Sequence, residues 1–235
     1  MNRAALLAGA GGILIGAAAM VFAGGYNPVG GDRAEIEGVV RDYILANPEI
    51  IPDAMRRLQE REVAKVVDAN REALETPFAS AWAGAKDGDV VLVEFFDYAC
   101  GFCRKSNADV ERLLREDKNL KVVWREWPVL GQDSLAAAEA SLAAAAEGRF
   151  RDDHDRLFAE GRPDAAAVAA TKAAVGISAS PSAEHQREIE KNYELARSIG
   201  ATGTPTFVVG DKVLQGAVGY DALKQAIAEA RSSQS

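Results

Sequence analysis

The sequence predicts an α/β fold in which a buried strand runs through a Cys-x-x-Cys turn into a helix. Val91–Phe96 is a short, bulky and mostly apolar run, typical of a central strand that is covered on both faces. Cys100 and Cys103 follow this run, and apolar residues then recur at helical spacing from Val110 onward. The next predicted strand, Leu120–Trp127, completes a parallel βαβ unit, because a helical crossover separates the two strands.

The composition is that of an ordinary soluble protein with an apolar N-terminus. The chain has 235 residues, of which 48% are hydrophobic and 26% are charged. This length suffices for one packed domain and a smaller unit. The formal net charge of -8 argues against nucleic acid, or an anionic membrane surface, as a partner.

Residues 1–25 have the features of a targeting segment. Arg3 gives a short positive region, residues 4–23 are uncharged and apolar, and Val21-Phe22-Ala23 resembles a small-residue cleavage site. The apolar run is nearly long enough to span a bilayer. A cleaved signal peptide and a membrane anchor formed by residues 4–23 are therefore both open. Either one predicts a protein of the periplasm or cell envelope, outside the cytoplasm, where disulfide chemistry takes place.

Residues 26–76 are predicted to form a linker and an N-terminal helical module. After the Gly/Pro linker, one amphipathic helix begins near Arg33, and a second runs from about Pro52 to Leu74. The apolar residues of the second helix do not follow a strict heptad, so a coiled coil is not indicated. Two such helices cannot bury their apolar stripes alone. They are expected to pack on the main domain or on another subunit.

Residues 77–231 are predicted to form the main domain, and residues 232–235 a loose tail. The domain begins with an edge strand over Phe78–Trp82. A β-hairpin and a closing amphipathic helix end it. The remaining predicted elements are helices at 134–147, 150–160, 164–174 and 182–198, the hairpin strands at 206–209 and 212–214, and the last helix at 220–231.

Cys100 and Cys103 are the candidate catalytic residues, and they are the only cysteines of the chain. Cys100 falls at the N-cap or first turn of the predicted helix, where unpaired N–H groups and the helix dipole stabilise a thiolate. The thiolate is the nucleophilic form. Cys103 shares the buried face of the same helix. We therefore expect Cys100 to attack and Cys103 to resolve the mixed disulfide.

Glu94 is the third candidate catalytic residue. It alternates with Leu92 and Phe96, which points its side chain into an apolar layer. A buried carboxyl group has a raised pKa and can hold or release a proton near neutrality. The alternative is a glutamate at a strand end that faces water, and the alternation leaves both placements open.

Two motifs resemble the DsbA-like branch of the thioredoxin fold. One is V-E-F-F-D-Y leading into C-G-F-C at 93–103, and the other is G-T-P-T-F at 203–207. The resemblance implies a thioredoxin fold with a helical insertion at about 130–199. It also implies that Glu94 is a buried proton carrier, that the Thr204–Pro205 bond is cis, and that Phe102, Thr204 and Pro205 contact the substrate. Strongly oxidising members carry a histidine where Phe102 stands, so one stabiliser of the thiolate is missing here.

The segment I-L-A-N-P-E-I-I at 44–51 resembles the N-terminal module of the ScsC (suppressor of copper sensitivity) type subgroup. In that subgroup the module drives oligomerisation, which implies a homo-oligomer, a trimer by resemblance. The resemblance implies a disulfide oxidoreductase without cofactor that acts, isomerase-like, on cysteines of unfolded or misfolded exported proteins. A membrane redox partner would reset its disulfide. The alternatives are a monomeric dithiol oxidase of the same fold, a holdase-like binding module, and a protein that sequesters copper with its two cysteines.

Metal binding is the remaining alternative for the cysteines. Structural zinc needs four ligands, so His154 and His185 would both have to converge on Cys100 and Cys103. We therefore predict no zinc site. Cu(I), which is content with two thiolates, is less easily dismissed. His154 is expected to be a packing residue and His185 a solvated helix residue.

Overall fold

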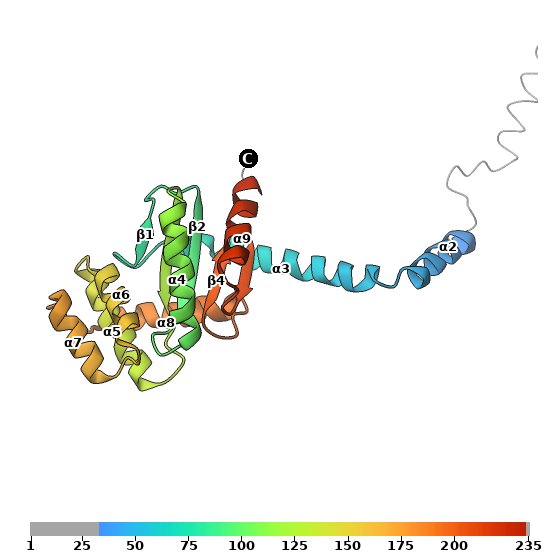
Figure 1. Cartoon of the computed structure of the whole chain (residues 1–235). Coiled ribbons are helices and arrows are strands. Elements are labelled where there is room, and N and C mark those ends of the chain that lie inside the picture. The colour runs from blue at the N-terminus through green and yellow to red at the C-terminus, as the bar shows by residue number, and fades with distance from the viewer. Residues whose placement is uncertain (1–32, 234–235) are drawn as a thin grey trace, which may run out of the picture. The chain divides into compact units, whose positions relative to one another are not determined.

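A computed structural model describes residues 33–233, and its centre is a five-stranded mixed sheet (Figure 1). The strand order is β1-β3-β2-β4-β5. Strands β2 and β3 are parallel and joined by helix α4, while the other neighbouring pairs are antiparallel. The strands are β1 (Trp82–Gly84), β2 (Val90–Phe96), β3 (Leu120–Glu126), β4 (Thr206–Val209) and β5 (Lys212–Gln215). The predicted parallel βαβ unit is therefore confirmed.

The chain divides into two compact units, of which one ends at Arg57 and the other begins at Leu58, so the boundary falls within helix α3 (Ile50–Glu75). The predicted leader at 1–25 and the linker up to Asp32 lie outside the described residues. Within residues 33–233, no helix combines the length and apolarity that a membrane crossing requires. The helices are α2 (Arg33–Ala46), α3 (Ile50–Glu75), α4 (Gly101–Glu116), α5 (Gln132–Ala146), α6 (Phe150–Glu160), α7 (Ala165–Val175), α8 (Ala183–Ser198) and α9 (Tyr220–Ser233).

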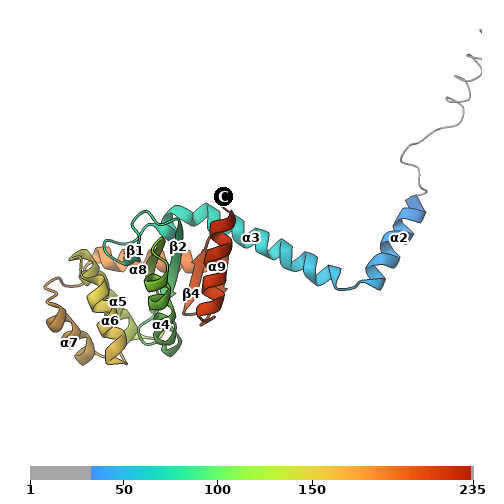
Figure 2. The same cartoon turned by 45° about the horizontal axis from the view of Figure 1, so that its top comes forward.

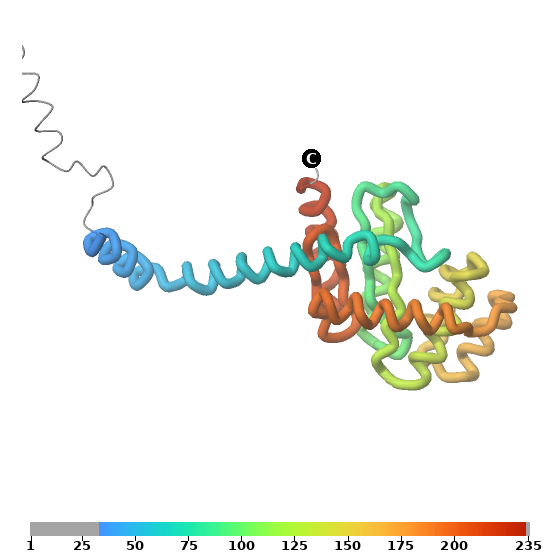
Figure 3. Tube along the Cα trace, turned by 180° about the vertical axis from the view of Figure 1, so that it is seen from behind, coloured from blue at the N-terminus to red at the C-terminus, as the bar shows by residue number. Residues whose placement is uncertain are grey.

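Side chains of each strand alternate between the two faces of the sheet, and an apolar cluster covers each face. On one face, Leu92 and Phe96 of β2 pack with Cys103, α4 and α9. On the other face, Val93 and Phe95 pack against α3 and α8. Figure 3 shows this second face, with the C-terminal part of α3 and α8 running across it. Strand β2 is thus buried on both sides, as its apolar run predicts.

In the sequence, the predicted helical insertion lies between the two halves of the thioredoxin fold. Helices α5 to α8 lie between β3 and β4 in the chain, and α5, α6 and α7 pack together (Figure 2). Helix α5 is mostly alanine on its buried side, which lets its neighbours approach closely. The first residues of the insertion lie beside the turn that carries the cysteines, because the N–H of Leu130 donates to the carboxylate of Asp97 in that turn.

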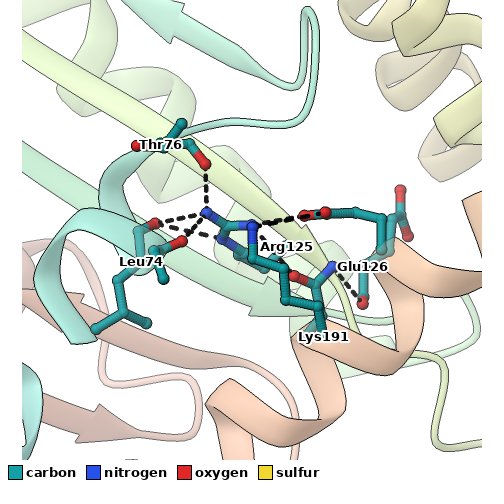
Figure 4. Close-up of polar contacts among 8 residues, drawn as sticks. Leu74, Thr76, Arg125, Glu126 and Lys191 are labelled. Atoms are coloured by element: carbon teal, nitrogen blue, oxygen red, sulfur yellow. Dashed lines mark hydrogen bonds and ion pairs between the residues drawn. The ribbon is translucent and has the colours of Figure 1, made fainter. Parts of the chain in front are cut away.

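Arg125 fastens the end of α3 to the sheet (Figure 4). Its side chain is 1% exposed and donates hydrogen bonds to the backbone oxygens of Ala73, Leu74 and Thr76. These oxygens lie at a helix C-terminus, where carbonyl groups lack partners within the helix. The same guanidinium also donates to Glu188 of α8 at 2.7 Å. One side chain of β3 therefore joins α3, α8 and the sheet.

The first strand and the last helix differ from their predicted bounds. Phe78–Ala81 is a turn rather than strand, because the N–H of Ala81 donates to the oxygen of Phe78 at 2.9 Å. The N–H and hydroxyl of Ser80 both donate to the oxygen of Ala145, away from the sheet. At the other end, α9 continues to Ser233. The predicted loose tail at 232–235 thus begins as helix, and residues 234–235 lie outside the described chain.

The two histidines have different outcomes. His154 is fully buried among the rings of Phe96, Tyr98 and Phe150, which confirms it as a packing residue. The prediction that His185 is solvated is wrong, since it is 4% exposed. Its Nδ1 accepts the N–H of Ser182 at 3.1 Å in a capping box that starts α8. The capping bond and the edge of the Phe78 ring hold it inside.

Candidate active site

The two cysteines occupy the first turn of α4, directly after β2. Cys100 is the N-cap residue, and its Sγ accepts the backbone N–H of Cys103 at 3.4 Å. Both are free thiols in this structure. Cys103 is fully buried, whereas Cys100 keeps 6% of its surface exposed. A substrate disulfide can therefore reach Cys100 first.

The surroundings of the two thiols separate their pKa values. The hydrogen bond with the Cys103 thiol is the largest influence on Cys100, followed by burial, which opposes it. Hydrogen bonds with the side chain of Thr204 and with the N–H groups of Cys103 and Phe102 lower the pKa of Cys100 further, so that it falls to about 5. Burial raises the pKa of Cys103, and the hydrogen bond to Cys100 adds to this effect. At neutral pH, Cys100 is a thiolate and Cys103 keeps its proton.

Glu94 lies in the buried middle of β2. Its side chain is 2% exposed. Of the two placements that the sequence left open, buried or facing water, the structure has the buried one. The indole N–H of Trp124, its register partner on β3, donates to its carboxyl at 3.1 Å. Burial raises the pKa of Glu94 to about 8, against the bond from Trp124, and the negative charge of Cys100 adds to the rise. Glu94 can therefore exchange a proton near neutral pH.

The loop before β4 lies against Cys100. The Thr204–Pro205 bond is cis, Pro205 is buried, and Cys100 Sγ lies 3.3 Å from the backbone oxygen of Thr204, to which only the protonated thiol can donate. Phe102, between the cysteines, has 67% of its side chain exposed. The structure thus brings Cys100, Cys103 and Thr204 together, with Phe102 on the open side.

Asp97 is a residue of the site that the sequence analysis missed. Its buried carboxylate accepts the N–H of Ala99 at 2.7 Å, and those of Val129 and Leu130 at 2.8 and 3.0 Å. It therefore holds the loop after β3 against the turn that presents Cys100. The bond to Ala99 is an Asx turn, a local signal that the sequence contains. The other two bonds join residues more than thirty positions apart and leave no local signal.

The histidines do not join the cysteines. His154 Nδ1 lies 3.2 Å from the hydroxyl of Tyr98, and His185 caps α8. Across residues 33–233, no three His, Cys, Asp or Glu side chains gather closely enough to hold a metal ion. The ligand set that zinc requires is therefore not assembled in the described part of the chain.

Two family models match the chain. Residues 91–228 match the DSBA-like thioredoxin domain, and residues 32–65 match the Copper resistance protein ScsC N-terminal domain. Among solved structures, a linker-deletion variant of ScsC from Proteus mirabilis is 29% identical with a TM-score of 0.71, covering 88% of this chain and 97% of that one. A periplasmic thioredoxin-like protein from Salmonella enterica serovar Typhimurium is 26% identical with a TM-score of 0.65, covering 69% and 95%.

Curated relatives share the same region. Disulfide bond formation protein D of Bacillus subtilis is 29% identical over 164 residues, which is 61% of this chain and 73% of that protein. A Na(+)/H(+) antiporter, NhaA 1 of Salinispora arenicola, is 28% identical over 156 residues, or 63% of this chain. The chain spans only 24% of that antiporter. Because the DSBA-like model covers more than half of the chain, including both cysteines, Glu94 and Pro205, this protein belongs to the DSBA-like thioredoxin domain family of thiol–disulfide oxidoreductases.

Proposed function

We propose that the protein rearranges disulfide bonds in exported proteins, with Cys100 as nucleophile and Cys103 as resolving thiol. The observation that carries this proposal is the opposite shift of the two thiol pKa values, downward for Cys100 and upward for Cys103. A thiolate at neutral pH attacks disulfides, while a protonated neighbour leaves the mixed disulfide time to rearrange.

The reaction keeps all electrons in sulfur. The Cys100 thiolate attacks one sulfur of a substrate disulfide, forms a mixed disulfide, and releases the second substrate sulfur as a thiolate. A different substrate thiolate then attacks the substrate sulfur of the mixed disulfide. This step gives the substrate a new disulfide and returns Cys100 as a thiolate, so no net oxidation occurs.

Resolution by Cys103 is the alternative exit. Its sulfur attacks Cys100, the substrate leaves as a thiolate, and the protein is left with a Cys100–Cys103 disulfide. Cys103 must lose a proton for this step, and ionised Glu94 can accept it, because its pKa is raised to about 8. A membrane redox partner with a dithiol must then reduce the protein again. Phe102, in place of a histidine, and Thr204–Pro205 face the substrate.

The isomerase direction rests on the N-terminal helices. On α2, Ile36, Val40 and Tyr43 are 50%, 51% and 61% exposed, so residues 33–233 leave this apolar stripe uncovered. The match of residues 32–65 to the ScsC N-terminal domain supports a homo-oligomer, a trimer by resemblance. Several active sites held together raise the effective concentration of thiolate around one misfolded substrate. We place this particle in the periplasm or cell envelope.

Truncation tests the oligomeric isomerase. A version that begins at Leu58 keeps the part of α3 that packs on the sheet, and residues 26–235 serve as the reference. We expect an oligomer for the longer chain, and a monomer with weaker reactivation of scrambled substrate for the shorter one, by light scattering and activity. If both chains are monomers with equal isomerase activity, the protein is a simple monomeric oxidoreductase.

Alkylation tests the thiol roles. At pH 6 we expect Cys100 to react more than about 100-fold faster than Cys103 in the reduced protein, because only Cys100 is largely ionised there. Mass spectrometry of the labelled peptides measures both rates. Equal rates would contradict the assignment. Absence of turnover on scrambled substrate, together with tight Cu(I) binding that alkylation abolishes, would identify a copper-sequestering protein instead.

A further inference from the structure

A positively charged cleft borders the proposed nucleophile. Its volume is about 480 Å³, and its lining residues are Ala99, Arg104, Leu130, Gln132, Asp133 and Arg162. Ala99 immediately precedes Cys100, so one wall of the cleft is the turn that presents the thiol. The other walls come from α4, from the loop after β3, from the first turn of α5 and from the segment between α6 and α7. The cleft therefore lies directly beside the turn that presents the Cys100 thiol.

The cleft is cationic in an acidic protein. Two guanidinium groups and one carboxylate line it, although the whole chain carries a formal net charge of -8. Arg104 donates a hydrogen bond to the backbone oxygen of Gly161, which fixes its direction. Arg162 is 82% exposed and lies 3.8 Å from Asp133. Since that ion pair is long and open to water, it holds Arg162 weakly.

The apolar side of the same site is held in place. Leu130 is 55% exposed, and Val129 beside it is 40% exposed. Exposed apolar side chains grouped beside a cationic cleft are typical of a binding surface. The Asp97 carboxylate holds both backbone N–H groups at 2.8 and 3.0 Å and the N–H of Ala99 at 2.7 Å. The backbone on this side of the cleft is thus held in place beside the turn that presents Cys100.

We propose that this cleft binds the carboxylate of an aspartate or glutamate located two or three residues from the substrate's reacting cysteine. Arginine suits this task, because its planar donors match a carboxylate. Arg104 is one helical turn beyond Cys100, about 6 Å along the axis, and two extended residues span about 7 Å. The inference rests on the proposed function, and it adds a preference among substrates: acidic segments around a cysteine react faster.

Paired peptides test the preference. Each contains one cysteine in a mixed disulfide with an aromatic reporter thiol, with glutamate or glutamine two residues before or after it. The second-order rate of reporter release by the reduced full-length protein is measured, and the readout is the ratio of the Glu to the Gln peptide. We expect a ratio of about 5 for the protein itself, the size that one exposed ion pair supports.

Substitutions in the cleft should change the ratio of the Glu to the Gln rate in opposite directions, depending on the charge that is removed. Arg104→Gln and Arg162→Gln should each lower it toward 1, whereas Asp133→Asn should raise it, because a competing carboxylate is removed. Arg115→Gln, on the exposed side of α4 and outside the cleft, is the matched control and should leave it unchanged. Equal ratios in all variants would overturn the proposal, as would a ratio of 1 in the unmodified protein.

Binding without chemistry separates this proposal from the proposed function. A Glu peptide with serine in place of cysteine is titrated against isotope-labelled protein, and the amide signals of Ala99, Leu130 and Gln132 are followed by NMR. Shifts at these residues with the Glu peptide, and weaker ones with the Gln peptide, support the cleft even if no disulfide is exchanged. Thiol exchange that proceeds without such shifts and without a preference for Glu refutes the cleft alone.

Discussion

Glu94 and Arg125 are buried ionisable side chains on neighbouring strands, and they lie on opposite faces of the sheet. In the register of β2 and β3, Glu94 pairs with Trp124 and Phe95 pairs with Arg125, so the two side chains point to opposite faces. They are 2% and 1% exposed. Arg125 donates to three backbone oxygens, Glu188 and Asn192, whereas Glu94 accepts one hydrogen bond. The two side chains are thus buried to a similar extent, but Arg125 has several hydrogen-bond partners and Glu94 has one.

The number of partners decides what each group does. A buried charge costs several kcal/mol unless partners replace its water, and the partners of Arg125 do so. Burial lowers the pKa of Arg125 while Glu188 raises it, and an arginine stays charged throughout. Glu94 has one neutral donor, so burial raises its pKa to about 8 and it takes up a proton. One face of the sheet is therefore organised for stability, and the other for proton exchange.

The largest expected effect is on the Arg125 side. Arg125→Ala leaves Glu188 and the last carbonyls of α3 without their donor, and should lower the free energy of unfolding by about 3–5 kcal/mol. Arg115→Ala, on an exposed face, should change it by less than about 0.5 kcal/mol. Urea unfolding followed by circular dichroism measures both. Equal small losses would show that the Arg125 bonds do not hold the fold.

The second effect sharpens the contrast on the Glu94 side. Glu94→Gln keeps the size and the bond from Trp124 but cannot carry a proton, so turnover should fall by about 100-fold while the protein stays folded. Glu184→Gln, at an exposed position of α8, is the control. Rates are compared from pH 5 to 9 on a dithiol peptide. An unchanged rate across this range would exclude Glu94 as the proton carrier.

The third expected effect is the pH dependence of stability. The folded pKa of Glu94 is about 8 and its ordinary value is 4.5, so its contribution is fully present below about pH 4.5 and is lost as pH rises through 8. In the oxidised protein the charge of Cys100 is absent, but burial still raises the pKa of Glu94, so stability falls as pH rises above 4.5. Glu94→Gln should remove the slope.

The reduced protein provides the opposing case. The pKa of Cys100 is lowered from 9.0 to about 5, so its contribution is present above pH 9 and is lost as pH falls through 5. Between these values it counteracts Glu94, and the reduced protein should show a flatter dependence than the oxidised one. Denaturant midpoints of both forms at several pH values measure this. Parallel curves for the two forms would contradict the opposite shifts.

Local pattern was sufficient for the centre of the molecule. The apolar run of β2, the helical spacing after Cys103 and the crossover to β3 each depend on neighbouring residues, and all three were predicted. The alternation also offered the buried placement of Glu94. Its single partner, Trp124, comes from another strand. Whether Glu94 titrates near neutrality therefore could not be predicted without the register.

Most of the features that the sequence did not predict depend on contacts between distant segments. The bonds of Arg125 to α3 and α8 span from 49 to 67 residues. The carboxylate of Asp97 reaches Leu130 across 33 residues, and Arg104 reaches Gly161 across 57. Nothing in the local pattern distinguishes these arginines from solvated ones. His185 was misjudged for a different reason, since histidine replaces the usual Glu or Gln of the capping box.

The two edge strands, β1 and β5, bear on how the proposed substrates, unfolded exported chains, would meet the sheet. An exposed sheet edge invites pairing with extended polypeptide, and repeated encounters would turn a catalyst into a seed for aggregates. Here β1 has 3 residues and ends at Gly84, whose φ of 90° turns the backbone away from strand geometry. At the other edge, β5 has 4 residues, begins with exposed Lys212, and ends at Gln215, whose amide bonds back to Thr202 and Gly200. Both edges are too short to template a neighbour, and Gln215 is already bonded at the β5 edge, so the clients proposed above could bind and leave without joining the sheet.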